Sequence, residues 1–325
     1  MVVDGTQSNV GYAIDDGGSL YKMTGATFTT IASLRDNGTS GATRGEDLLM
    51  YQVNGVDKLL YFYEDDGGLY SLDDVTFNDT FLSGTTAGKA QLQNAPHPAV
   101  IFPDNNRAYI GNGQYLAEFN GNTSGGSNGT LDATKIDLGP GWEITSLFIM
   151  TNFTGMCAWQ KNQDKSQRTQ SAVFLWDGVS DKPNKSIPVE DNKIEASINK
   201  NGTIFLLTQG RQSASALRRL TDNGAALIRN FRFDIAGTTV DFTASKGSIS
   251  YRKILDVFNN QLLQVYTDNN STYIAKIKNG KIVPIQNLGK KYSIFNWYNS
   301  YRGNNLNNYS RFLKFKEDNN TYGFI

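Results

Sequence analysis

Apolar and aromatic residues recur along the chain in short runs, and clusters of Asp, Asn and Gly separate the runs. The clearest case is residues 60–72, where two apolar arms flank an Asp-Asp-Gly-Gly sequence at residues 65–68. The same phrase occurs at residues 10–23, with its turn at residues 15–18. Glycine supplies the positive φ that tight hairpin turns need. Both segments are therefore predicted to be β-hairpins of one kind.

The hairpin pattern occurs five more times with a more divergent sequence, at residues 107–119, 155–176, 203–220, 262–274 and 312–324. Its anchor positions on the second arm are Tyr21, Tyr70, Tyr115, Phe174, Leu217, Tyr273 and Tyr322. Even spacing, short strands and Asn/Asp-Gly turns are typical of propeller blades, which bury their two apolar faces against neighbouring blades. We predict an all-β fold, a β-propeller of about seven four-stranded blades, as a single domain over residues 1–325.

The two ends of the chain bear on how such a ring would close. The first copy starts close to its second strand and the last stops just after its third, so the first and last blades are expected to be incomplete. Either the N-terminal residues pair with the C-terminal hairpin, or the natural polypeptide continues beyond Ile325. We favour the first alternative, because an unpaired edge strand lowers solubility.

Charge and composition exclude some classes of partner. Lys and Arg number 31 and equal Asp and Glu, which argues against a general nucleic-acid binder or a membrane-surface binder. No basic leader precedes an apolar run, and no apolar run reaches the roughly 20 residues of a membrane span, so no signal peptide and no membrane insertion are expected. The one cysteine, Cys157, has apolar neighbours and is expected in the core.

Few residues in the sequence indicate a catalytic or metal-binding site. The single histidine, His97, rules out zinc sites built on several histidines and most His-based triads, and we expect it in a surface loop. The Asp-Asp-Gly-Gly turns lack the alternating oxygen ligands and the closing Glu of a calcium loop. We therefore predict no catalytic residue, no metal and no cofactor, and a protein that is not an enzyme. A weaker alternative is a glycoside hydrolase or lyase, which needs a clustered acid pair that the sequence does not single out.

Two clusters could take part in binding. Five arginines crowd one predicted blade, namely Arg211, Arg218, Arg219, Arg229 and Arg232. Arg218 and Arg219 are adjacent and should point to opposite faces of a strand, which favours solvated or blade-linking arginines over a substrate clamp. Aromatic residues before the last hairpin stand beside several asparagines and form a candidate binding rim for a sugar or a protein. The rim consists of Tyr292, Trp297, Tyr298 and Tyr301.

Three phrases, at residues 108–117, 136–141 and 174–181, resemble propeller segments of bacteriophage virion proteins. The resemblance spans roughly residues 100–290 and assigns no functional residues. It implies a virion component made in the host cytoplasm, since phage tail assemblies, nozzle-type proteins among them, carry β-propellers. We expect a non-enzymatic, tail-associated scaffold that contacts other virion proteins in a symmetric assembly. The alternative is a glycan-binding propeller that recognises a host surface glycan.

Overall fold

The structure is a computed structural model, and its description covers the greater part of the chain. The described residues are 2–3, 10–14, 19–24, 27–33, 45–63, 67–71, 77–78, 92–93, 95–102, 105–121, 129–160, 170–209, 215–230, 255–258, 261–267, 272–278, 281–287, 313–317 and 320–324. They contain 26 strands and no helix. The prediction of an all-β fold is confirmed.

The chain divides into two compact units, and the first comprises Met1–Ile144 and Tyr298–Ile325. Its first sheet contains β1 (Val2–Val3), β2 (Val10–Ile14), β3 (Ser19–Thr24) and β4 (Thr27–Ser33). Its second contains β5 (Gly45–Val53), β6 (Val56–Tyr63), β7 (Gly67–Ser71) and β8 (Phe77–Asn78). Its third contains β9 (Ala99–Phe102), β10 (Arg107–Asn112), β11 (Tyr115–Asn120) and β12 (Thr130–Asp137). A hairpin of β25 (Leu313–Glu317) and β26 (Asn320–Phe324) completes it.

The second unit comprises Thr145–Trp297. One of its sheets contains β13 (Trp142–Ile149, which begins in the first unit), β14 (Thr154–Gln160), β15 (Ser171–Trp176) and β16 (Lys185–Val189). The next contains β17 (Lys193–Lys200), β18 (Thr203–Gln209), β19 (Ser215–Thr221) and β20 (Gly224–Asn230). The last contains β21 (Leu255–Phe258), β22 (Gln261–Thr267), β23 (Thr272–Lys278) and β24 (Lys281–Asn287).

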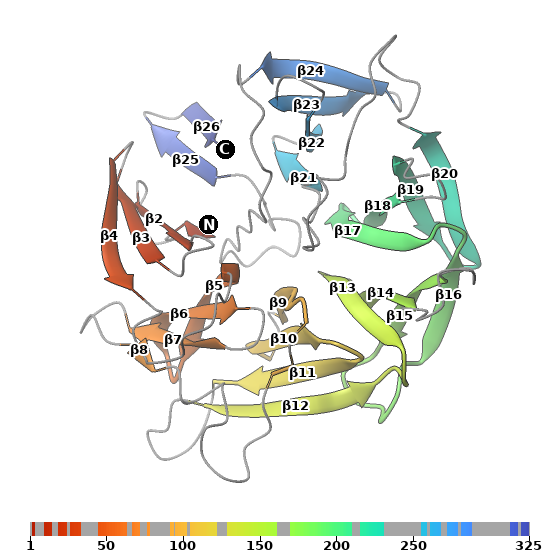
Figure 1. Cartoon of the computed structure of the whole chain (residues 1–325), viewed down its shortest axis with the longest axis horizontal. Helices are drawn as coiled ribbons and strands as arrows, with labels where there is room; N and C mark the ends of the chain where they lie inside the picture. Colours follow the sequence, from red (N-terminus) through yellow and green to blue (C-terminus); the bar gives the residue numbers. More distant parts are fainter. Residues whose placement is uncertain are drawn as a thin grey trace. The chain divides into compact units, whose positions relative to one another are not determined.

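Within each four-stranded sheet the strands lie in chain order, so every such sheet is a meander (Figure 1). Sheets that follow one another in the sequence also pack together within each unit: β5 contacts β1, β2 and β9, and β17 contacts β14, β15 and β21. Successive four-stranded meanders that pack on one another make up a β-propeller arrangement. The predicted propeller class is therefore confirmed, whereas the count of seven blades stays a prediction, as does the single domain.

The first sheet differs from its prediction. It has four strands, because Val2 and Val3 form β1 and pair with Tyr12 and Gly11 of β2. The prediction of an incomplete first blade is wrong, since two valines are too short a run to be read as a strand. In the described part of the chain β1 contacts β25, but the pairing partner of β25 is β26. The predicted pairing of the N-terminal residues with the C-terminal hairpin is therefore also wrong for β1.

Both hairpins first identified in the sequence, at residues 10–23 and 60–72, are present. The turn predicted at residues 65–68 is wrong, because Gly67 and Gly68 belong to β7 and lie opposite Phe62 and Tyr61 of β6. Leu60 of β6 lies opposite Leu69 of β7, and Ala13 of β2 lies opposite Tyr21 of β3. The centres of their turns, residues 15–18 and 64–66, lie outside the described residues.

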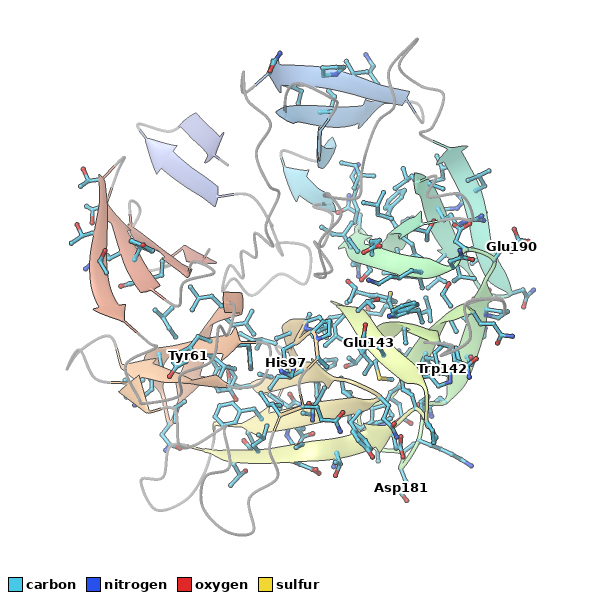
Figure 2. All side chains as sticks on the ribbon, in the orientation of Figure 1. Tyr61, His97, Trp142, Glu143, Asp181 and Glu190 are labelled. Carbon is cyan, nitrogen blue, oxygen red and sulfur yellow. The ribbon has the colours of Figure 1, made fainter. Side chains whose placement is uncertain are left out.

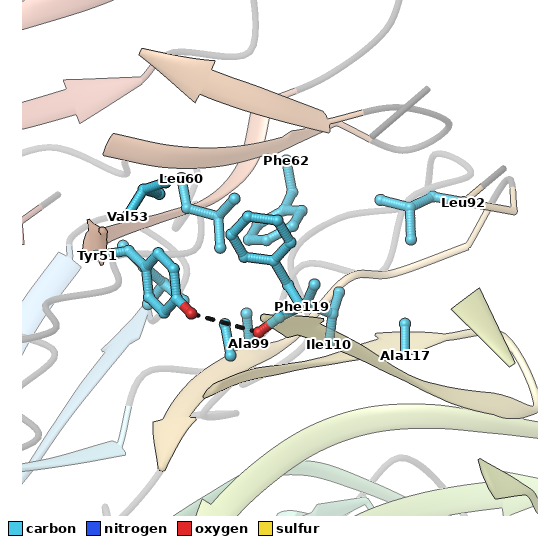
Figure 3. Close-up of a cluster of buried hydrophobic side chains, with 11 residues drawn as sticks. Tyr51, Val53, Leu60, Phe62, Leu92, Ala99, Ile110, Ala117 and Phe119 are labelled. Atoms are coloured by element: carbon cyan, nitrogen blue, oxygen red, sulfur yellow. Dashed lines mark hydrogen bonds between the residues drawn. The ribbon is translucent and has the colours of Figure 1, made fainter. Parts of the chain in front are cut away.

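Buried apolar side chains fill the space between the second and third sheets (Figure 3). The second sheet contributes Tyr51, Leu60 and Phe62, and the third contributes Ile110 and Phe119. The ring centroids of Tyr51 and Phe119 are 5.2 Å apart and tilted by 53°. Burial of large side chains such as these stabilises the fold by about 1.5–3 kcal/mol each.

A second core lies in the second unit, between the sheet that starts with β13 and the sheet that starts with β17. Cys157 is buried there with Val173 of β15 and with Ile194 and Leu206 of the next sheet. The prediction that Cys157 is a core residue is confirmed.

Candidate functional site

The predicted binding rim cannot be placed on this structure. Tyr292, Trp297, Tyr298 and Tyr301 lie outside the described residues, so the rim stays a prediction. The sites that follow come from the described part of the chain.

The outer strand β20 presents consecutive apolar side chains to solvent. Leu227 is 55% exposed and Ile228 is 37% exposed, and Ala226 before them is exposed as well. β20 is the last strand of its sheet among the described residues, and none of them forms a further strand hydrogen-bonded to its outer edge. β16 of the preceding sheet contacts β20 without pairing with it. An apolar, open edge is suited to pairing with an extended segment of another chain.

The outer strands β12, β16 and β24 carry features that oppose such pairing. β12 exposes Asp132 and Asp137, and β16 exposes Lys185. β16 and β24 also contain Pro188 and Pro284, and proline has no N–H to donate to an added strand. β24 exposes Ile285 directly after its proline. Of these four outer strands β20 is thus the most open to strand addition. β4 also lacks charge and proline, but its described exposed side chains are the polar Thr27, Thr29 and Thr30.

A buried ion pair holds β20 against the preceding sheet. Arg218 of β19 donates from Nε to Asp191 Oδ2 at 2.5 Å and from Nη2 to Asp191 Oδ1 at 3.0 Å. Thr208 of β18 donates its hydroxyl to the same carboxylate. Arg218 also donates from Nη1 to the carbonyl of Ala225 in β20 at 2.9 Å. Since Asp191 follows β16, this arginine ties the end of one sheet to the outer strand of the next.

Of the other four arginines in the predicted cluster, the description includes the side chain of Arg219 alone. Arg219 is exposed while Arg218 is buried, so the two face opposite sides of β19 as predicted. Arg211 and Arg232 lie outside the described residues, as does the side chain of Arg229. The prediction that these arginines link blades is confirmed for Arg218.

A second exposed apolar side chain stands on a well-ordered loop between β15 and β16. Val179 is 85% exposed. Beside it, Asp177 Oδ1 accepts from the backbone N–H groups of Ser180 at 2.8 Å and Val179 at 2.9 Å. Oδ2 accepts from Ser180 Oγ and from Asn184 Nδ2, both at 2.9 Å. These hydrogen bonds, led by the N–H groups of Ser180 and Val179, hold the pKa of the Asp177 carboxyl well below its usual range.

The same loop is fixed to its sheet. The indole Nε1 of Trp176 donates to the carbonyl of Ser180 at 2.6 Å, and the backbone N–H of Asn184 donates to the carbonyl of Leu175 at 2.8 Å. Asp181 projects from this loop toward solvent (Figure 2). The loop therefore holds Val179 in one defined position.

His97 does not lie in a surface loop, so that prediction is wrong. Its side chain is 0% exposed, and its Nδ1 lies 2.8 Å from the carbonyl oxygen of Gly111. In Figure 2 it lies among side chains next to β9 and β10. Two neighbouring prolines fix the extended backbone on either side of it, and Pro98 accepts the backbone N–H of Gly111 at 2.7 Å. The hydrogen bond between Gly111 and Pro98 holds this segment against β10, so the His97 side chain is buried in the core.

Sequence analysis missed the exposed apolar edge of β20 and the partner of Arg218. The signal for the edge was present, because Gly224-Ala-Ala-Leu-Ile follows an Asp-Asn turn without a proline or a charge. No pattern marks Asp191 as the partner of Arg218, because 27 residues separate them and only the packing of two sheets brings them together.

Metal clusters and membrane-spanning helices are both absent from the described ranges. They contain no group of three or more His, Cys, Asp or Glu side chains placed to hold a metal ion. They also contain no helix long and apolar enough to cross a membrane.

No protein-family model and no curated protein matches the sequence. Among solved structures, the chain is similar to the propeller of Dos1 (TM-score 0.56, 11% identity, 90% of this chain and 84% of that chain covered). It is similar to a puromycin-hydrolyzing peptidase of Mycobacterium tuberculosis (TM-score 0.56, 8% identity, 91% of this chain covered) and spans 48% of the length of that chain. It is also similar to a chain of the mitotic checkpoint complex (TM-score 0.53, 10% identity, 99% and 90% covered). At these identities the likeness shows the fold alone, a β-propeller arrangement.

Proposed function

We propose that this protein is a non-enzymatic β-propeller of about seven blades that serves as an interaction scaffold, holding a partner protein on the outer edge of β20. The observation that carries the proposal is the exposed run of Ala226, Leu227 and Ile228 on that edge. Strand addition supplies affinity through main-chain hydrogen bonds and specificity through alternate side chains.

The surroundings of β20 indicate the chemistry of the segment it would take. Arg219 lies directly opposite Ala226 in the pairing of β19 with β20, and it is exposed. A strand added beside β20 would lie about 9–10 Å from β19, a distance that the long exposed side chain of Arg219 spans to an acidic side chain on the same face. We therefore propose an extended partner segment that alternates apolar residues and carries one acidic residue.

The setting we propose is a bacteriophage particle, with the protein in or near the tail as part of a symmetric assembly. This part rests on the resemblance of residues 100–290 to propeller segments of virion proteins. None of the three similar structures is described as a phage protein, so the setting needs its own test.

That test begins with purified particles of the source phage, in which mass spectrometry should detect the chain. Particles assembled with the variant Leu227→Lys, and separately with Ile228→Lys, should contain several-fold less of it. The matched control is Ile285→Lys on β24, which replaces an equally exposed side chain beside a proline and should leave incorporation unchanged. Absence of the chain from the particles would refute the virion setting, and equal incorporation of all variants would refute the role of β20.

The alternative proposal is a glycan-binding propeller whose rim contains Tyr292, Trp297, Tyr298 and Tyr301. A glycan array probed with the full chain separates the two proposals. Glycan binding that is lost in Trp297→Ala and kept in Leu227→Lys would favour the glycan-binding function over the scaffold function.

A further inference from the structure

The sequence contains eight Asn-Gly pairs, an unusual density of a chemically labile dipeptide. Glycine has no Cβ, so its backbone nitrogen can approach the side-chain carbonyl carbon of the preceding asparagine. The structure describes both residues of five pairs, which begin at Asn54, Asn112, Asn120, Asn201 and Asn223. These five have very different surroundings.

Two of the pairs are held by buried hydrogen bonds. Asn112 Oδ1 accepts from the backbone N–H of Gln93 at 2.6 Å, and its Nδ2 donates to the carbonyl of Ala133 at 3.0 Å. After Asn120, the backbone N–H of Gly121 donates to the hydroxyl of Tyr51 at 2.8 Å. In the first pair the side-chain amide is fixed, and in the second the attacking nitrogen is already engaged.

Two exposed pairs are restrained at the glycine. The backbone N–H of Gly202 donates to Asn199 Oδ1 at 2.9 Å, which engages the nitrogen that follows Asn201. Gly224 follows Asn223 but is the first residue of β20 and pairs with Thr221, so it belongs to the ladder of the hairpin. Both glycine nitrogens are thus engaged in the structure of the folded chain. This engagement competes with their attack on the side chain of the preceding asparagine.

The pair Asn54-Gly55 resembles Asn201-Gly202, which is also an exposed two-residue turn, with φ of 51° and 81°. It differs at the position two residues before the turn, where it has Gln52 in place of Asn199, whose Oδ1 accepts the N–H of Gly202. It is the two-residue turn between β5 and β6, with φ of 49° and 83°, the conformation of a type I′ turn. Both residues are exposed, and a Cβ built on Gly55 would meet nothing within 4 Å. As a central turn residue, Gly55 lies outside the strand ladder, unlike Gly224.

We propose that Asn54 is the preferred site of spontaneous deamidation in the folded protein among the five described pairs. The backbone nitrogen of Gly55 forms a bond to Cγ of Asn54, the bond from Cγ to Nδ2 breaks, and ammonia leaves with the proton of the glycine N–H. Water then opens the cyclic imide at either carbonyl and leaves aspartate or isoaspartate. No oxidant or reductant takes part.

The position of Asn54 gives this modification a structural effect. Its backbone N–H donates to the carbonyl of Gly121 at 3.0 Å, which joins the second sheet to the third. Isoaspartate inserts a methylene into the main chain of a two-residue turn, so this hydrogen bond and the turn cannot both keep their geometry. The modified chain should show a lower midpoint of urea unfolding than the unmodified chain.

The test incubates the full folded chain in mildly alkaline buffer and follows each Asn-Gly peptide by mass spectrometry that separates aspartate from isoaspartate. Conversion at Asn54 should exceed that at each of the other four described pairs, several-fold for the buried pairs that begin at Asn112 and Asn120. In urea-unfolded chain the five sites should convert at similar rates, because the same dipeptide is then free of its surroundings. The variant Asn199→Ala releases the nitrogen of Gly202 and should raise conversion at Asn201 several-fold while Asn54 stays unchanged.

Conversion at Asn54 that does not exceed conversion at every one of the other four described pairs in the folded chain would overturn the proposal. So would a ranking of the five sites that is the same in folded and unfolded chains, since surroundings would then have no part in it. An unchanged rate at Asn201 in Asn199→Ala would refute the restraining role of the glycine hydrogen bond.

Discussion

At the scale of single residues, Tyr51 joins two sheets of the first unit through one hydroxyl group. That hydroxyl donates to the carbonyl of Asn106 at 2.5 Å and accepts from the N–H of Gly121 at 2.8 Å. The dashed line in Figure 3 marks its longer contact with the carbonyl of Phe119. Burial raises the pKa of Tyr51 from 10.0 to about 12, so the folded state favours the neutral phenol.

The variant Tyr51→Phe tests this hydroxyl. At neutral pH we expect the free energy of unfolding to fall by about 1–3 kcal/mol, because a buried N–H and a buried C=O lose their partner. In the wild type the contribution of Tyr51 is complete below pH 10 and is lost as the pH rises from 10 through 12. Urea unfolding at several pH values should show this alkaline loss in the wild type and a weaker one in Tyr51→Phe. Parallel curves for the two proteins would contradict the assignment.

The pH dependence of stability expected for Asp177 has the opposite sign to that expected for Tyr51. Its pKa is lowered in the folded state, so its contribution is present above the ordinary value of 3.8 and is lost only as the pH falls through the lower folded value. The loop should therefore keep its structure in mild acid. In Asp177→Asn, which loses the charged acceptor, the indole N–H resonance of Trp176 should shift at neutral pH. An unchanged resonance would show that the carboxylate does not order the loop.

At the scale of elements, close approach of neighbouring strands depends on glycine at defined positions. A Cβ on Gly155 of β14 would overlap the ring of Phe148 on β13. A Cβ on Gly224 of β20 would meet only the carbonyl oxygen of Pro188, at the ordinary distance of 3.9 Å. A methyl group at residue 155 would therefore displace Phe148, whereas a methyl group at residue 224 fits without a clash.

The variant Gly155→Ala should lower the free energy of unfolding by about 1–3 kcal/mol, the usual cost of overpacking a core. The control Gly224→Ala should change it much less, because its added methyl group fits. Combining Gly155→Ala with Phe148→Leu should recover part of the loss. Chemical unfolding of the four proteins measures these differences, and equal losses in the two single variants would count against the steric explanation.

The elements were largely predictable from sequence, and the side-chain partners were not. Alternating apolar runs and Asn/Asp-Gly turns are local signals, so the hairpin of β6 and β7 could be predicted. Its register could not, because Gly67 and Gly68 look like turn residues and instead pair with Phe62 and Tyr61. The strand at Val2–Val3 was too short to give a pattern. The burial of His97 and the pairing of Arg218 with Asp191 depend on contacts between distant segments, which no local pattern encodes.

At the scale of the whole molecule, hydrogen bonds and ion pairs between side chains and their neighbours join consecutive sheets inside each unit. In the second unit, Ser146 of β13 and Ser197 of β17 share a hydrogen bond of 2.7 Å, and Thr145 donates to the carbonyl of Ile194 at 2.5 Å. The ion pair of Asp191 and Arg218 joins the same two sheets. Apolar packing between sheets is thus supplemented by directional bonds.

The variant Arg218→Met leaves Asp191 as a buried charge without its cation, and we expect a loss of about 3–5 kcal/mol in the free energy of unfolding. The double variant Arg218→Met with Asp191→Leu removes both charges and should be less destabilised than Arg218→Met alone. A double-mutant cycle from urea unfolding measures the coupling. Additive losses would show that the two side chains act independently.

The meander order of the strands has a consequence for synthesis on the ribosome. Every strand in a four-stranded sheet pairs with the strand next to it in the chain, so a sheet is complete once its own segment has emerged. Hairpins can close while the rest of the chain is still being translated, and docking of one sheet on the previous one can follow in the order of synthesis. A growing propeller would therefore expose two uncovered apolar faces, one on its first sheet and one on its newest sheet.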